Sequence, residues 1–197
     1  MPTMDFATDT IYYKLVYYGE AFGGKLTRLR YLESILPGSG PLRLECGPDD
    51  DGMMIYCDYR LPLPARADGF EEIFRVQSIH RGNFYERTRT GMLDGADGIV
   101  FVGDSQRDKL EQNIKRLQEL ARGLAVRQRK ISRIPFVLHY TKRDDPNALP
   151  VPIMDKYLNP LGWPVFESGL GKSPDDLLPG SIEAFTAICR LVASRVG

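Results

Sequence analysis

The sequence predicts a three-layer α/β fold in which a mixed, mostly parallel six-stranded sheet is covered by helices on both faces. Two observations indicate this fold class: strand-like runs alternate with helix-like runs, and a glycine-rich loop separates the first strand from the first helix. The strand-like runs 53–63 and 71–79 have no helix between them, which predicts one antiparallel pair at an edge. The length of 197 residues fits a single domain over residues 1–197.

Each expected element has its own sequence pattern. The aromatic and β-branched run IYYKLVYY and the continuous apolar run GIVFVGDS are typical of buried strands. Apolar residues recur at helical spacing in KLTRLRYLESIL and in DKLEQNIKRLQELARGLAV. We therefore expect strands over 11–18, 53–63, 71–79, 98–105, 134–142 and 163–168, and helices over 25–36, 108–126, 151–158 and 181–196.

Composition argues against several classes of protein. Basic and acidic residues balance at 26 each, so no overall charge draws the chain to nucleic acid. The three cysteines lack CxxC spacing, which predicts reduced thiols rather than a zinc site. The chain begins without a secretion signal, and no apolar run approaches the roughly 20 residues of a membrane helix. We expect a cytoplasmic protein without an integral membrane segment. RQRKISR, at 127–133, is a local basic run that could meet an acidic lipid or a partner, but we expect a solvated helix end.

The segment GEAFGGKL is the main functional motif, and it fits the pattern GxxxxGK between a strand and a helix. In such loops the glycines let backbone N–H groups turn toward phosphate oxygens, and the lysine neutralises phosphate charge. The other interpretation is a glycine-rich turn that only packs the helix on the sheet. We predict nucleotide binding at Gly19, Glu20, Ala21, Phe22, Gly23, Gly24, Lys25, Leu26 and Thr27.

A second motif, TKxD at Thr141-Lys142-Arg143-Asp144, closes the expected strand 134–142. Its order and position after the glycine loop are similar to those of Ras-like GTPases. In those proteins the aspartate accepts hydrogen bonds from the guanine N1–H and 2-amino groups, and the lysine stem stacks on the base. The resemblance therefore implies that this chain selects guanine over adenine.

Over nearly its whole length the chain resembles the bacterial MglA-type small Ras-like GTPases, which set cell polarity and motility. The most specific stretches are DGIVFV followed by DS, and KRDDPNALP. The resemblance implies a P-loop NTPase fold of the Ras-like type and binding of GTP or GDP. It implies a partner that is a roadblock-type regulatory protein, MglB-like, or another MglA-type protein. It assigns guanine binding to Thr141, Lys142 and Asp144, and a last base-contacting loop to Ser168, Gly169 and Leu170.

Two departures from the family pattern lie in the glycine loop. Leu26 stands where the family has the threonine that holds Mg²⁺, and a leucine offers no oxygen ligand. Thr27 is one residue further, about 100° around a helix, so it does not replace that ligand. Ala21 stands at a family glycine, and its Cβ points near the γ-phosphate. Binding of Mg²⁺ is therefore doubtful, and no metal ligand is predicted.

Two further departures lie in the switch regions. In the family a PGQ-like segment precedes FY, and the matching stretch here places Arg81 at the switch glycine and Gly82 at the water-orienting glutamine. His80 or Asn83 is a possible substitute, but we expect His80 and Arg81 to be exposed loop residues. Asp49, in an acidic run, lies near the switch threonine of the family, where we expect a solvated loop rather than a cation site.

The sequence thus predicts an MglA-like regulatory protein that binds guanine nucleotide in cell polarity or motility and has lost hydrolysis, with no catalytic residue. Two alternatives stay open. One is a slow but active GTPase that needs a partner. The other is a nucleotide-free protein-interaction module.

Overall fold

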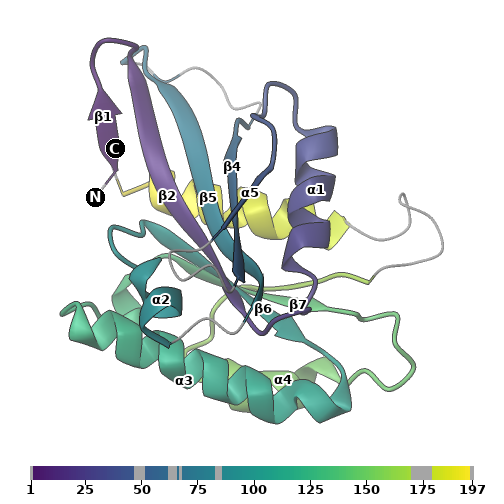
Figure 1. Cartoon of the computed structure of the whole chain (residues 1–197). Helices are drawn as coiled ribbons and strands as arrows, with labels where there is room; N and C mark the ends of the chain where they lie inside the picture. The colour runs from purple at the N-terminus through teal and green to yellow at the C-terminus, as the bar shows by residue number, and fades with distance from the viewer. Residues whose placement is uncertain are drawn as a thin grey trace.

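The fold is seen in a computed structural model, which describes residues 2–46, 52–61, 66, 68–82, 86–169 and 179–195. The elements follow one another in the order β1 (Thr3–Asp5), β2 (Thr10–Gly19), α1 (Lys25–Ile35), β3 (Arg43–Cys46), β4 (Gly52–Tyr59), β5 (Glu71–Gly82), α2 (Glu86–Gly91), β6 (Gly98–Asp104), α3 (Leu110–Val126), β7 (Phe136–Thr141), α4 (Val151–Leu158), β8 (Val165–Glu167) and α5 (Pro179–Ala193). Short 3₁₀ turns lie at Arg107–Lys109 and Ile131–Arg133. The expected three-layer α/β architecture is confirmed (Figure 1).

One sheet of eight strands forms the middle layer, in the order β3-β4-β5-β2-β6-β7-β8, with β1 paired to β2. The strands from β5 to β8 in this order run parallel. The pair β4–β5 is antiparallel, as predicted for the two runs without a helix between them. The prediction of six strands was wrong, because β1 and β3 are also present. These two are three and four residues long and largely exposed, so they carry no strong apolar pattern.

Strand β5 is longer than the sequence suggested. It was expected to end at residue 79 but continues to Gly82, because Met53 and Gly52 of β4 pair with Arg81 and Gly82. The polar sequence HRG has no strand-like pattern. It joins the sheet because its backbone pairs with β4. The expectation that His80 and Arg81 are loop residues is therefore wrong for their backbone.

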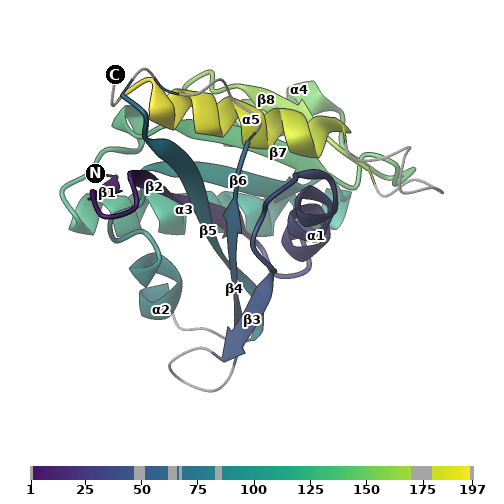
Figure 2. The same cartoon turned by 90° about the horizontal axis from the view of Figure 1, so that it is seen from above.

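Helices cover both faces of the sheet, and Figure 2 shows the same arrangement from above. Helices α1 and α5 lie on one face, where one core cluster includes Leu29, Leu32, Phe185 and Ile188. Helices α3 and α4 lie on the other face, over a second cluster that includes Leu120 and Met154. The central strands are covered by helices on both faces, so successive side chains are buried. This explains why the sequences of these strands are continuous apolar runs. Among the described residues, no helix is long and apolar enough to cross a membrane.

Phe185 provides the test of this packing, because its ring meets Tyr59 at 5.1 Å and Phe74 at 6.2 Å between ring centroids. Phe185→Ala leaves a cavity between α5 and the sheet, so we expect it to lower the free energy of unfolding by about 3–5 kcal/mol. Urea unfolding followed by circular dichroism measures the change. Leu191→Ala, on the same helix but 38% exposed, is the matched control and should cost about 1 kcal/mol or less. Equal losses in the two variants would contradict this description of the core.

Candidate functional site

The glycine loop has a conformation that only glycine permits at two positions. Gly19 ends β2 with φ of 152°, and a Cβ there would lie 2.2 Å from the carbonyl oxygen of Val102 in β6. Gly24, the residue before α1, has φ of 88°, and its Cβ would lie 2.4 Å from Nη1 of Arg28. The glycines therefore allow the backbone to turn tightly between strand and helix, as a phosphate-binding loop requires.

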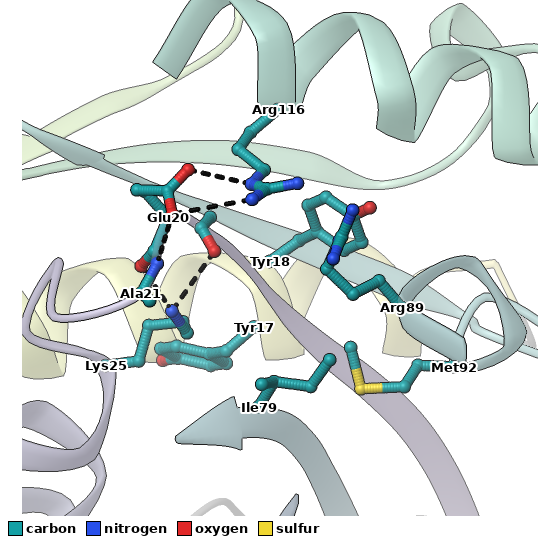
Figure 3. A pocket seen from close by; sticks show the side chains of 10 residues that line it. Tyr17, Tyr18, Glu20, Ala21, Lys25, Ile79, Arg89, Met92 and Arg116 are labelled. Carbon is teal, nitrogen blue, oxygen red and sulfur yellow. Dashed lines mark hydrogen bonds and ion pairs between the residues drawn. The ribbon is translucent and has the colours of Figure 1, made fainter. Parts of the chain in front are cut away.

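Lys25 begins α1 and folds back over this loop. Its Nζ donates hydrogen bonds to the carbonyl oxygens of Gly19 at 3.1 Å and Glu20 at 2.6 Å (Figure 3). Burial lowers the pKa of Lys25 to about 8, although the carboxylate of Glu20 opposes this shift. No side chain caps α1, so the N–H groups of its first turn remain available to an acceptor. The lysine, these amides and the helix dipole form a site suited to an anion.

An ion-pair network joins the glycine loop to the helices beside it. Glu20 accepts from the N–H of Ala21 at 3.0 Å and pairs with Nε of Arg116 at 2.8 Å. Arg116 also pairs with Glu119 on α3 at 2.7 Å, and Glu119 pairs with Arg89 on α2 at 2.7 Å. Burial acts to raise the pKa of Glu119, but hydrogen bonds from Arg89 and Tyr18, together with the charges of Arg89 and Arg116, lower it overall. The network thus connects the loop to α2 through α3.

A pocket of about 230 Å³ opens beside this network. Figure 3 shows Lys25, Arg89 and Arg116 around it, with Ile79 and Met92 along one side. Tyr18 closes it next to α3, and the Tyr18 hydroxyl donates to Glu119. Because each arginine already pairs with a carboxylate, the pocket walls are held in place by ion pairs.

A second pocket, of about 170 Å³, lies beside the start of α1. Phe22, Leu26 and Ile79 give it an apolar lining, and Thr27 supplies the one side-chain oxygen among its described lining residues. Leu26 is half-buried and packs against the core, whereas Thr27 is exposed. Within the described ranges, no group of three or more His, Cys, Asp or Glu side chains is placed to hold a metal ion.

The TKxD motif meets the glycine loop at the end of β7. The hydroxyl of Thr141 donates to the carbonyl oxygen of Gly23 at 2.9 Å. Lys142 has φ of 56°, and its Nζ pairs with Asp104 at 2.5 Å and donates to Gln106 at 2.9 Å. The structure therefore brings together the two motifs that the sequence separates by more than a hundred residues.

The third predicted loop lies against the second. The N–H of Arg143 donates to the carbonyl oxygen of Ser168 at 3.1 Å. A Cβ on Gly169 would lie 2.8 Å from a carboxylate oxygen of Asp144, so this close approach also depends on glycine. Ser168, Gly169 and Asp144 are thus neighbours, as the predicted base site requires.

A buried arginine, Arg28 of α1, connects the glycine loop to the loop at Ser168 and Gly169. It is 1% exposed, and its Nε and Nη2 both donate to the hydroxyl oxygen of Ser168 at 3.2 Å. Nη2 also donates to the carbonyl oxygen of Gly169 at 3.1 Å, and Nη1 contacts that of Gly24 at 3.5 Å. Burial lowers the pKa of Arg28 to about 10, opposed mainly by the carboxylate of Asp144, so the side chain stays charged at neutral pH.

His139 lies fully buried next to the same serine. Its Nε2 is 2.8 Å from the hydroxyl oxygen of Ser168, and its Nδ1 has no hydrogen-bond partner among the described residues. Burial lowers the pKa of His139 to about 3, with a contribution from the nearby charge of Arg28. Since Ser168 accepts from Arg28, its own proton is directed to Nε2, and the imidazole is neutral.

The predicted switch residues are placed only in part. His80, Arg81 and Gly82 belong to the end of β5, and the structure describes their backbone pairing alone. Asp49, Asn83 and Leu170 lie outside the described residues. The structure thus assembles the predicted phosphate and base residues and leaves the switch assignments as predictions.

Comparison with known proteins places the chain in a family. No protein-family profile matches it. The mutual gliding-motility protein MglA of Myxococcus xanthus is 30% identical over 197 residues, covering 100% of this chain and 98% of that protein. The chain belongs to the MglA-type family of small Ras-like GTPases. This membership agrees with the resemblance seen in the sequence and with the observed α/β fold.

Several residues of this MglA-type site were not predicted from the sequence. Arg28 had a weak signal, because it follows Lys25 by one helical turn and lies beside apolar Leu29. Arg116 and Glu119 sit on a long amphipathic helix, where charged residues are ordinary. His139 lies inside a buried strand, and its position alone does not show which loop it contacts.

The buried His139 predicts acid sensitivity. Its pKa is lower in the folded protein than in the unfolded chain, so its stabilising effect is complete above pH 6.5 and is lost as pH falls toward 3. We expect the free energy of unfolding to drop by about 1.4 kcal/mol for each pH unit below 6.5. Urea unfolding between pH 7 and pH 5 measures this slope.

A pair of glutamine variants isolates the effect. His139→Gln should flatten the slope, whereas His80→Gln, which removes the other histidine, should retain it. A slope that survives in His139→Gln would assign the acid sensitivity to other groups.

Proposed function

We propose that this protein is a guanine-nucleotide-binding regulator of the MglA type that binds nucleotide without depending on Mg²⁺ and has lost useful hydrolysis. The observation that carries the proposal is the hydrogen bond from Thr141 to Gly23, which joins the base-reading motif to the phosphate loop. The similar protein from Myxococcus xanthus is a gliding-motility protein by its name. The proposal extends a role in cell polarity or motility to this chain.

The phosphate end of the proposed site consists of the loop amides, the start of α1 and Lys25. Gly24 permits the left-handed turn that leads into α1, and the uncapped helix presents N–H donors. Lys25 has its ammonium group beside this loop and is available to phosphate oxygens. These features fit a diphosphate, and Glu20 is compatible with it because Arg116 neutralises its carboxylate.

The base end consists of Lys142, Asp144 and the loop at Ser168 and Gly169. Asp144 would accept the two donors of guanine, in the role that the family resemblance implies. Lys142 is held by Asp104 and Gln106, which orients its stem along the proposed base site. Arg28 supports this end by fixing Ser168 and Gly169.

The residues present do not fit a bound Mg²⁺. That ion prefers oxygen ligands in near-octahedral geometry, with several waters retained. Leu26 stands at the position of the usual ligand, and Phe22 and Ile79 make the adjacent space apolar. We therefore assign no step of the function to a metal.

Loss of hydrolysis follows from the residues that replace the family's chemistry. Ala21 adds a methyl group where the family has glycine, and Gly82 offers no side chain to orient water. Removing a single group that stabilises a transition state typically costs roughly 10²–10³-fold in rate. A partner protein could supply the missing catalytic groups. The alternative function is therefore a slow GTPase that depends on such a partner, and a hydrolysis assay with the partner present would test it.

One observation favours a second candidate, a nucleotide-free interaction module. The loop satisfies part of its own hydrogen bonding, since Lys25 bonds to the Gly19 and Glu20 carbonyls and Glu20 holds the N–H of Ala21. In either function we propose a roadblock-type, MglB-like protein or another MglA-type protein as the partner. Nucleotide measured in the purified protein separates the two candidates.

Substitution of Leu26 tests the loss of the metal site. We expect Leu26→Thr to introduce a dependence of GDP affinity on Mg²⁺, because it restores a hydroxyl at the ligand position. Calorimetric titration of GDP, with Mg²⁺ and with EDTA, measures the ratio of the two affinities. Leu26→Val is the matched control, since it has the shape of threonine without the hydroxyl, and its ratio should stay near one. An equal response of the two variants would rule out a lost ligand at this position.

The lowered pKa of Lys25 gives a test of the phosphate site. Free Lys25 loses its proton near pH 8, and phosphate binding requires the charged form. We expect GDP affinity to fall by up to about tenfold per pH unit above pH 8. Lys25→Arg, which stays charged at these pH values, should bind GDP with a flatter pH profile. Identical profiles for the two proteins would show that Lys25 does not meet the phosphates.

A further inference from the structure

A basic pocket lies outside the nucleotide site, where α3 ends and the chain turns toward β7. The pocket has a volume of about 270 Å³ and is lined by Gln128, Arg129, Lys130, Arg133 and Ile134. The surrounding sequence RQRKISR, at 127–133, contains four cations and no carboxylate. In a chain of zero net charge, such a concentration of positive charge is local and specific to this surface.

The charges that line this pocket have no carboxylate partner in the described part of the chain. Among the described residues, no carboxylate lies within ion-pair distance of Arg129, Lys130 or Arg133, whereas their neighbour Arg127 pairs with Asp94 at 2.5 Å. Arg127 also donates to the carbonyl oxygen of Gly123 at 2.9 Å, so it compensates the negative end of α3. The other three cations are therefore not needed to balance the helix.

The backbone that carries these cations is held by hydrogen bonds. Gln128 has φ of 55°, and the N–H of Arg129 donates to the carbonyl oxygen of Leu124 at 2.9 Å, while the N–H of Gln128 donates to that of Ala125 at 2.9 Å. These bonds form a Schellman motif, which ends the helix in a defined turn. Arg195, near the end of α5, donates to the carbonyl oxygen of Arg133 at 2.6 Å. The backbone beneath the pocket is thus held in a defined turn.

The position of the pocket leaves the nucleotide site free. The pocket precedes β7, which starts at Phe136, and the TKxD motif follows the end of β7 at Thr141. The two sites therefore lie at opposite ends of this strand. Val126 next to the pocket is 81% exposed, so an apolar side chain accompanies the cations. Cations beside an exposed apolar group are typical of a surface that meets the headgroups of a lipid layer.

We propose that this pocket binds a phosphate group, and that its source is the headgroup of an anionic phospholipid. Arg129, Lys130 and Arg133 would surround the phosphate, with Val126 facing the acyl boundary. The protein would then dock on an anionic membrane surface with the phosphate loop and the TKxD motif directed away from the lipid. This proposal does not depend on nucleotide binding.

Co-sedimentation of the full chain with vesicles tests the proposal. One set of vesicles contains phosphatidylcholine alone, and the other also contains phosphatidylglycerol. We expect binding only to the second set, and we expect the triple variant R129Q/K130Q/R133Q to lose roughly 100-fold, since each basic residue contributes roughly fivefold to binding of an anionic surface. Thermal unfolding checks that the variant remains folded.

A charge-matched variant controls for net charge. R30Q/K115Q/K156Q removes three exposed cations from α1, α3 and α4, and it should bind the anionic vesicles as the unaltered protein does. Equal losses in the two triple variants, or no binding by the unaltered protein, would overturn the proposed site.

Titration with inorganic phosphate, followed by NMR shifts of residues 128–134, separates the two sources of the phosphate group. Shifts together with vesicle binding support the lipid source. Shifts without vesicle binding would overturn the lipid source and assign the pocket to a soluble phosphate ligand.

Discussion

The buried charge of Arg28 is the constraint on which the arrangement of the site depends. A guanidinium removed from water must be compensated, and here Ser168, Gly169 and the carboxylate of Asp144 supply that compensation. Arg28 belongs to the helix that begins at the glycine loop, whereas its partners belong to the loops that follow β7 and β8. The two ends of the proposed nucleotide site are therefore fixed relative to each other without a ligand, which would reduce the ordering cost of binding.

The opposite side of the phosphate loop is held by a second set of charges. Glu20, Arg116 and Glu119 run from the loop across α3 to α2, the helix that follows the switch segment. The space next to Leu26 has an apolar lining that includes Phe22 and Ile79. In GTPases a metal ion and polar switch residues connect nucleotide to switch. In this chain ion pairs join the loop to α2 directly, beginning at Glu20 inside the loop, and the proposed metal-free function would use this path.

The sequence predicted the parts of the structure that are local. The strand, glycine loop and helix at residues 11–36 and the TKxD motif follow from short patterns, and the structure placed them as neighbours. What the sequence did not show depends on distant partners. The end of β5 at Gly82 is set by pairing with β4, and the short strands β1 and β3 have little apolar signal. The burial of Arg28 and His139 against Ser168 arises only when β7, β8 and α1 come together. The proposed loss of a metal ligand at Leu26, by contrast, rests on one position of the sequence and stays a prediction.

The central claim is that the chain keeps the nucleotide cradle without the metal, and equilibrium binding tests it most directly. Purified, nucleotide-free protein is titrated with fluorescent GDP and GTP, once with Mg²⁺ and once with EDTA. The account predicts micromolar or tighter binding that is the same in both conditions. Binding that disappears in EDTA would show that a metal is held after all, and an absence of binding in both conditions would show that the loop no longer serves a nucleotide.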